Sequence, residues 1–227
     1  MEEGHLFFGD YCSASDEEDN VEEEIVVVAI EGAPAVRLPQ QKRRGIGFQL
    51  WPAARFLCEE LAEHWPGGKR AIELGCGVGL CGIFAAKRFG CSVVMTDLPE
   101  VLDASRRATS MNGGCCDVRP LPWGQNVEAA AVPCGGVDVV LAADVVYWEK
   151  LHEPLRRTLR VLLEDYGATA IVAHAKRWRR DEKFFAACRK RFDLRVLVER
   201  VVRPEGPTER RQVYRLYRLD ARRRGVT

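Results

Sequence analysis

Short apolar runs alternate with amphipathic stretches along the chain from residue 70 onward. Apolar runs of about four to eight residues are typical of buried strands, whereas apolar side chains that recur about every three to four residues are typical of helices. Alternation of the two predicts a parallel sheet with crossover helices. The predicted strands cover 70–75, 91–96, 117–121, 137–143 and 168–174, and the predicted helices cover 79–89, 99–110, 151–165 and 180–191.

The pattern changes toward the C-terminus. Leu194–Val202 and Gln212–Leu219 are strand-like runs on either side of the turn-rich Arg203–Pro207. Two such runs joined by a turn predict an antiparallel hairpin. The predicted fold class is therefore α/β: a Rossmann-like seven-stranded mixed sheet with helices on both faces and a C-terminal antiparallel hairpin.

The segment before residue 70 adds peripheral elements. Pro52 suits the first turn of a helix, and Leu57 and Leu61 follow at helical spacing, so a helix is predicted to cover one edge of the core. Residues 25–30 form a β-branched run that predicts an edge strand. Residues 34–44, with two prolines and a basic end, are predicted to be a connector.

Composition bounds the class of protein. A chain of 227 residues fits one domain, and its 47% hydrophobic and 30% charged residues are typical of a globular protein. Its apolar runs fall well short of the roughly 20 residues that span a membrane. Residues 1–24 are acidic and poor in apolar surface, so we expect a disordered tail before a single domain at 25–227. The N-terminus lacks the features of a secretory or transit signal, which favours the cytoplasm or nucleus.

The cysteines and histidines do not predict a metal site. The nine cysteines are an odd number, are scattered along the chain and include no Cys-x-x-Cys pair. Such an arrangement argues against a disulfide framework or a zinc site. The four histidines, His5, His64, His152 and His174, are dispersed. We therefore expect chemistry without a metal.

Charge is distributed unevenly, although the formal net charge is only +1. Residues 1–36 hold eleven acids and no Lys or Arg, whereas the chain is strongly basic after Lys176. Basic residues beside an aromatic, as in Lys176–Arg180, can bind RNA or an acidic protein surface, and they can equally be a solvated helix face. The sequence leaves these alternatives open.

A glycine-rich segment carries the first sign of chemistry. The strand at 70–75 leads into Gly75, Gly77 and Gly79 and then into a helix, so a ligand can approach the backbone there. The next strand ends at Asp97, where an acid accepts hydrogen bonds from ribose hydroxyls. The loop lacks the Lys-Ser/Thr of a triphosphate-binding loop, so phosphate transfer is not indicated. Together, the loop and the acid predict a nucleoside ligand, and Asp97 can also cap the following helix.

Six segments between Gly45 and Leu219 resemble those of a known family, the class I seven-stranded S-adenosylmethionine-dependent methyltransferases. The likeness is to the branch of small protein-lysine methyltransferases that modify non-histone proteins, the methyltransferase-like 21 family. The loop is common to the class, whereas the tryptophan elements and the Asp-x-x-Tyr element are more specific. The segments are Gly47–Pro52, Glu73–Leu80, Thr96–Leu98, Asn112–Gly113, Leu121–Gly124 and Ala142–Tyr147.

The resemblance implies a cofactor site for S-adenosylmethionine. It assigns the loop glycines and Asp97 to the nucleoside, and it makes Trp123 an aromatic platform for the adenine. Without the resemblance, Trp51 and Trp123 would be interpreted as ordinary core residues. The implied cofactor-binding residues are Trp51, Glu73, Gly75, Cys76, Gly77, Asp97, Leu98, Trp123 and Ala143.

The resemblance also implies an acceptor site at Asp144 and Tyr147, just past a predicted strand. A free lysine has a pKa of about 10.4 and must lose a proton before it can accept a methyl group. We expect Tyr147 to pack against and hydrogen-bond the amine, and Asp144 to orient it or attract its cationic form. Alternatively, Asp144 caps the next helix.

The predicted function is methyl transfer from S-adenosylmethionine to a lysine of a non-histone cytosolic protein, for example an elongation factor or a chaperone. Cys76 and Val78 depart mildly from the family pattern. Val145 and Val146 replace the prolines of enzymes that methylate the amino groups of nucleic acid bases, which argues against a base as acceptor. A methyltransferase for RNA or a small molecule, or a non-catalytic binding protein on the same fold, are the alternatives.

Overall fold

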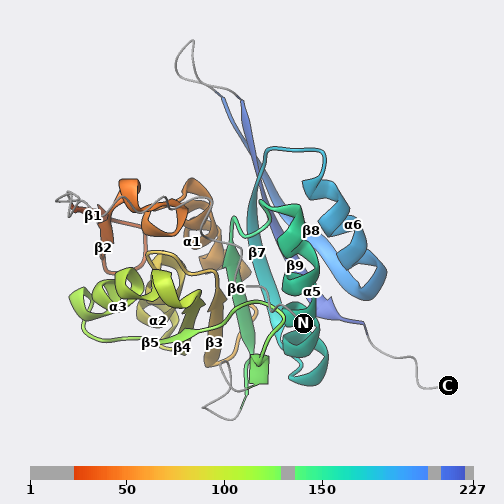
Figure 1. Ribbon diagram of the computed structural model, residues 1–227, viewed down its shortest axis with the longest axis horizontal. Helices are drawn as coiled ribbons and strands as arrows, with labels where there is room; N and C mark the ends of the chain where they lie inside the picture. Colours follow the sequence, from red (N-terminus) through yellow and green to blue (C-terminus); the bar gives the residue numbers. More distant parts are fainter. Residues whose placement is uncertain (1–22, 129–135, 204–210, 223–227) are drawn as a thin grey trace, which may run out of the picture.

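The computed structural model describes residues 23–128, 136–203 and 211–222. Seven strands form one sheet in the order β5-β4-β3-β6-β7-β9-β8, and β9 runs antiparallel to both of its neighbours (Figure 1). This confirms the predicted mixed sheet and its C-terminal hairpin. Most of the predicted turn, from residue 204, lies outside the described residues. The strands are β3 (Arg70–Leu74), β4 (Ser92–Asp97), β5 (Asp117–Pro120), β6 (Val139–Ala143), β7 (Thr169–Lys176), β8 (Phe192–Val202) and β9 (Gln212–Ala221).

The helices agree with the predicted ones apart from local irregularities. The helix expected over 99–110 begins with a 3-10 turn, and the helix expected over 151–165 is divided into a 3-10 turn, an α-helix and a π-helical turn. The α-helices are α1 (Pro52–His64), α2 (Leu80–Phe89), α3 (Leu102–Met111), α5 (His152–Arg160) and α6 (Asp181–Arg191). The short turns are η1 (Lys42–Arg44), η2 (Ile46–Phe48), η3 (Pro99–Val101), η4 (Glu149–Leu151) and the π-helical η5 (Val161–Asp165).

Two apolar layers cover the sheet, one on each face. Alternate residues of a strand point to opposite faces, so Ala71 joins one layer and its neighbour Ile72 joins the other. Side chains of α1, α2 and α3 complete the first layer, and those of α5 and α6 complete the second. Both faces are therefore buried, as a parallel sheet requires.

The N-terminal part of the described chain differs from the prediction. The predicted edge strand is β1 (Glu24–Val28), and it pairs with β2 (Val36–Gln40) in a separate antiparallel sheet of two strands. The predicted strand is therefore present, but it belongs to a small sheet of its own and not to the main sheet, and the predicted connector contains β2. Pro39 is compatible with this strand because a two-stranded sheet leaves one side of each strand without a ladder.

Asn112 holds this small sheet against the end of α3. Its side chain accepts a hydrogen bond from the Arg37 N–H at 3.2 Å and donates one to the Arg37 carbonyl at 2.7 Å. Glu23 also accepts a bond from Arg107 at 2.6 Å, so the last two residues of the predicted tail belong to the ordered structure. The rest of that prediction, residues 1–22, lies outside the described residues.

The sheet topology brings three strand ends to one place. β3 pairs in parallel with β4 on one side and with β6 on the other, so the chain leaves β3 in one direction and returns on the opposite side. Open α/β sheets bind ligands at the carboxyl edge of such a reversal. In the described part of the chain, no helix combines the length and apolarity that crossing a membrane requires.

Gly82 shows how tightly α2 packs on the sheet. A Cβ at this position would lie 2.6 Å from Met95 Cγ and 2.8 Å from Glu73 Oε2. Gly82→Ala should therefore lower the free energy of unfolding by about 1–3 kcal/mol through overpacking, as measured by denaturant titration. In the Met95→Ala background the added methyl has room. The double variant should therefore lose less free energy of unfolding than the sum of the two single variants, by about 0.5–3 kcal/mol. If the losses of the two single variants simply added in the double variant, the proposed overlap between the new methyl and Met95 would be contradicted.

Candidate active site

The turn after β3 is shaped for close approach of a ligand to the backbone. Gly75 and Gly77 adopt φ values of +65° and +51°, which side chains rarely tolerate. A Cβ at Gly75 would lie 3.0 Å from Val145 Cγ1 and 3.1 Å from Trp123 Cζ2. The Cys76 N–H donates to the Thr96 carbonyl at 2.9 Å, which holds the turn beside the end of β4.

Asp97 lies at this turn with half of its hydrogen-bonding capacity used. Its Oδ2 accepts from the Gly77 N–H and its Oδ1 from the Leu98 N–H, both at 2.8 Å. A carboxylate has about four acceptor positions, so two remain for a diol. Exclusion of water by the surrounding protein raises the pKa of Asp97 to about 6. The glycine turn and Asp97 thus fit the ribose of a nucleoside.

Glu73 and Cys76 support the turn from within the protein. Glu73 is buried, its Oε2 accepts from the Gly82 N–H at 2.8 Å, and burial raises its pKa to about 8. Burial likewise raises the pKa of the Cys76 thiol, which stays uncharged. These contacts link the loop to α2. Direct contact of either side chain with a cofactor stays a prediction.

Trp123 follows β5 and lies against the glycine turn. The adjoining Gly124 N–H donates to Thr158 Oγ1 on α5 at 2.7 Å, which fixes the position of the tryptophan. The indole lies beside Gly75 and packs against the second apolar layer, and its role as a platform for the adenine stays a prediction. Ala143 ends β6 opposite Ala173 of β7, at the same edge.

Tyr147 lies in the segment after β6, four residues beyond the end of that strand. Burial, and to a smaller extent the charge of Asp97, raises the pKa of Tyr147 to about 12. The phenol is therefore protonated at any physiological pH and can donate a hydrogen bond.

Asp144 is buried at the end of β6 in an uncommon backbone conformation, with φ of +60°. Its Oδ1 accepts from Arg177 Nη1 at 2.8 Å and from the Ala175 N–H at 3.2 Å, and its Oδ2 accepts from Arg177 Nη2 at 2.5 Å. The position before the next helical turn, η4, belongs to Trp148. Asp144 is therefore not a helix cap. It is one half of a bidentate ion pair.

Arg177 joins Asp144 to Trp51, which precedes α1. The guanidinium carbon lies 5.5 Å from the centroid of the Trp51 ring, and the Trp51 indole donates to the Ile46 carbonyl at 2.9 Å. In the sequence, Arg177 is recognisable only as part of the basic stretch Lys176–Arg180. Its pairing with Asp144 has no marker in the local sequence, because it depends on β6 and β7 being neighbours in the sheet.

Two further buried side chains, those of His174 and Asp181, lie next to the ion pair. His174 on β7 places Nδ1 3.7 Å from Asp144 Oδ1 and Nε2 3.3 Å from Asp181 Oδ2. Asp181 in turn accepts from the Trp178 N–H at 3.1 Å, at the start of α6. No sequence pattern marks this group, because Asp144 is distant along the chain from His174 and Asp181. Among the described residues, no group of three or more His, Cys, Asp or Glu is arranged to hold a metal ion.

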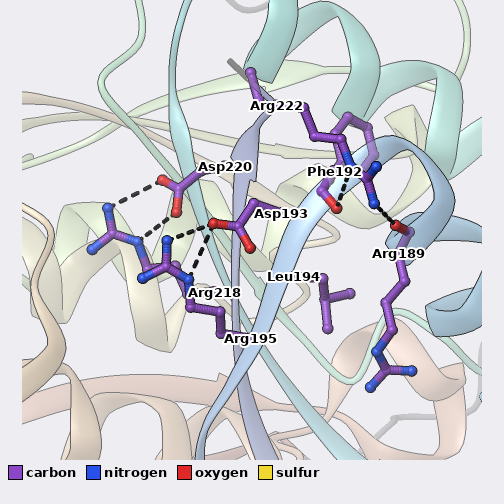
Figure 2. A pocket seen from close by; sticks show the side chains of 9 residues that line it. Arg189, Phe192, Asp193, Leu194, Arg195, Arg218, Asp220 and Arg222 are labelled. Carbon is purple, nitrogen blue, oxygen red and sulfur yellow. Dashed lines mark hydrogen bonds and ion pairs between the residues drawn. The ribbon is translucent and has the colours of Figure 1, made fainter. Parts of the chain in front are cut away.

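A cavity of about 900 Å³ lies at the opposite edge of the sheet, between α6, β8 and β9 (Figure 2). Two of the arginines that line it form ion pairs within the protein: Arg195 pairs with Asp193 at 2.5 Å, and Arg218 pairs with Asp220 at 2.8 Å. Elsewhere in the basic C-terminal region, Arg191 pairs with Glu164 at 2.5 Å. This region therefore gives no support to an RNA partner.

Comparisons with known proteins agree with this geometry. The sequence profile of a family described as Lysine methyltransferase matches residues 31–191. Protein N-lysine methyltransferase METTL21A of Danio rerio is 38% identical over 168 residues, 70% of this chain and 75% of that protein. EEF1A lysine methyltransferase 3 of Mus musculus is 35% identical over 148 residues, 63% of this chain and 62% of that protein. Histone-arginine methyltransferase METTL23 of Xenopus laevis is 34% identical over 135 residues, 57% of each.

A solved structure shows the same fold. It is the Pyrococcus abyssi tRNA (uracil-54, C5)-methyltransferase in complex with S-adenosyl-L-homocysteine, with a TM-score of 0.58 and 20% identity, covering 86% of this chain and 44% of that chain. The methyl donor of the present chain is S-adenosylmethionine.

The raised pKa of Asp97 predicts how cofactor binding depends on pH. Ribose hydroxyls donate to the ionised carboxylate, so affinity for S-adenosylhomocysteine should be constant well above pH 6 and fall as the pH drops through about 6. Below that value the loss should approach about tenfold per pH unit. Calorimetric titration from pH 5 to pH 8 measures it.

Asp97→Asn provides the comparison, since it should bind more weakly at pH 8 and lose most of the pH dependence. Asp193→Asn, at the opposite edge of the sheet, should follow the unmodified chain. A flat profile for the unmodified chain would contradict the assignment of Asp97 to the ribose.

Proposed function

The chain belongs to the lysine methyltransferase family, and we propose that it methylates a lysine side chain of a non-histone protein in the cytosol. Elongation factors and chaperones are the proposed substrate class, and the proposed location is the cytoplasm, with the nucleus as the second compartment. The observation that supports the proposal is the position of Asp144 and Tyr147. Both follow β6 at the edge where the glycine turn and Asp97 lie.

The nucleoside half of the site is built from rigid groups. Backbone amides hold the Asp97 carboxylate from two sides, so it needs little reorganisation to accept the ribose hydroxyls. The glycines leave the backbone of the turn accessible, and Trp123 provides an aromatic face beside Gly75. When bound, S-adenosylmethionine supplies a methyl carbon that the neutral amine nitrogen attacks, while the carbon–sulfur bond breaks and its electron pair stays on sulfur.

The acceptor half of the site has to bind a cation and then use a neutral amine. Asp144 attracts the protonated lysine, because a carboxylate that is largely shielded from water interacts strongly with an opposite charge. Tyr147, whose phenol remains protonated, packs against the amine and orients its lone pair toward the methyl group. The amine loses its proton to water before transfer.

Transfer of label into a cytosolic extract tests this function. The purified chain, radiolabelled S-adenosylmethionine and extract are incubated, and label is counted in the protein, RNA and small-molecule fractions. Label should enter lysine in a protein, and Asp97→Ala and Asp144→Ala should each reduce it by at least about 10²-fold, because each removes a positioned charge from the site. Tyr147→Phe should retain binding of S-adenosylhomocysteine and lose about tenfold in rate.

Asp193→Ala is the matched control, since it removes an aspartate at the opposite edge and should leave transfer unchanged. Label confined to RNA or small molecules would refute the lysine assignment while leaving the cofactor site intact. Absence of both label and S-adenosylhomocysteine binding would indicate a binding protein without turnover and would refute the enzymatic function.

A further inference from the structure

Arg177 fills a subsite whose chemistry suits any organic cation. Its two terminal nitrogens donate to Asp144 at 2.8 and 2.5 Å, and its guanidinium carbon lies 5.5 Å from the Trp51 ring centroid. A carboxylate next to an aromatic face binds both ammonium and guanidinium groups. The same two features are expected of a subsite for a protonated substrate lysine.

Access to the carboxylate depends on Arg177. The Asp144 side chain is 4% exposed, whereas that of Arg177 is 29% exposed. The Ala175 N–H also donates to Oδ1, and the buried His174 side chain lies 3.7 Å from the same oxygen. A second cation therefore reaches Asp144 by taking the place of Arg177.

Arg177 is placed where it can withdraw. It follows the last residue of β7 and precedes α6, so it belongs to neither element. Its backbone N–H makes a long 3.4 Å bond to Asp181 Oδ2, which does not restrain the side chain. Rotation of the side chain away from Asp144 breaks no strand or helix hydrogen bond.

We propose that Trp51 and Asp144 form the subsite for the acceptor's cation, and that Arg177 occupies it until a substrate lysine displaces the guanidinium. The identity of the cation as lysine rests on the proposed function, whereas the subsite requires only cation chemistry. Exchange of one cation for another keeps the buried charge of Asp144 compensated throughout. Burial raises the pKa of Tyr214, and the charges of Asp144 and Arg177 act on it in opposite directions.

The test uses n-butylammonium, a probe with the end of a lysine side chain. It is titrated into the S-adenosylhomocysteine complexes of the unmodified chain and of Arg177→Gln, and the indole N–H signal of Trp51 is followed by NMR. If the Arg177 guanidinium occupies the subsite most of the time, the apparent affinity for the probe is reduced by the fraction of time that the subsite is open. Arg177→Gln should therefore bind the probe at least about tenfold more tightly.

Two variants make the comparison specific. Arg179→Gln, which removes an exposed arginine two positions along, should bind the probe as the unmodified chain does. The double variant Arg177→Gln with Asp144→Asn should lose the gain. A folded Arg177→Gln that binds S-adenosylhomocysteine and shows no gain would overturn the proposal. Because the probe is not methylated in this experiment, the result is independent of whether any substrate protein is found.

A measurement on the unmodified chain covers the case in which Arg177→Gln leaves Asp144 uncompensated and fails to fold. Excess n-butylammonium should shift the Arg177 Nε–H and the Trp51 indole signals together, with one dissociation constant. The neutral n-butanol should shift neither. An Arg177 signal that ignores the amine would show that the guanidinium is permanently bound to Asp144, and it would overturn the proposal.

Discussion

The site depends on one constraint: three parallel strands, β3, β4 and β6, end side by side at the edge where the chain reverses its direction across the sheet. The backbone after β3 must turn sharply there while Val145 and Trp123 approach it to about van der Waals distance. Only glycine meets both demands at Gly75. The same turn directs the Gly77 N–H toward the Asp97 carboxylate. The shape of the loop therefore also determines the position of Asp97.

The features that local sequence encodes were predictable. Apolar runs located the five parallel strands, and the change of period located the hairpin, because both patterns reflect which side chains are buried. The glycine turn and Asp97 followed from spacing alone. The expectation that Trp123 is a platform for the adenine did not follow from spacing. It came from the resemblance, since an isolated tryptophan is as compatible with a core as with a ligand.

The features that depend on contacts between distant segments were not predictable. β2 contains a proline and an arginine, and only its pairing with β1 and its docking on Asn112 make it a strand. Arg177 and His174 gain their roles because β6 and β7 are neighbours in the sheet, which places Asp144 beside them. The interruption of the predicted helix at η5 likewise has no marker in its own residues, Val161–Asp165.

The pairing of Asp144 with Arg177 addresses a difficulty inherent in methylating a lysine. A carboxylate that attracts the ammonium also raises its pKa, and thereby opposes the loss of the proton that transfer requires. If Asp144 had no other partner, release of the neutral amine would leave a buried charge uncompensated, and the cationic form would be favoured further. Arg177 changes this balance because it can return to Asp144 as the amine gives up its proton. One carboxylate can then serve first to select a cation and afterwards to leave a neutral nucleophile beside Tyr147.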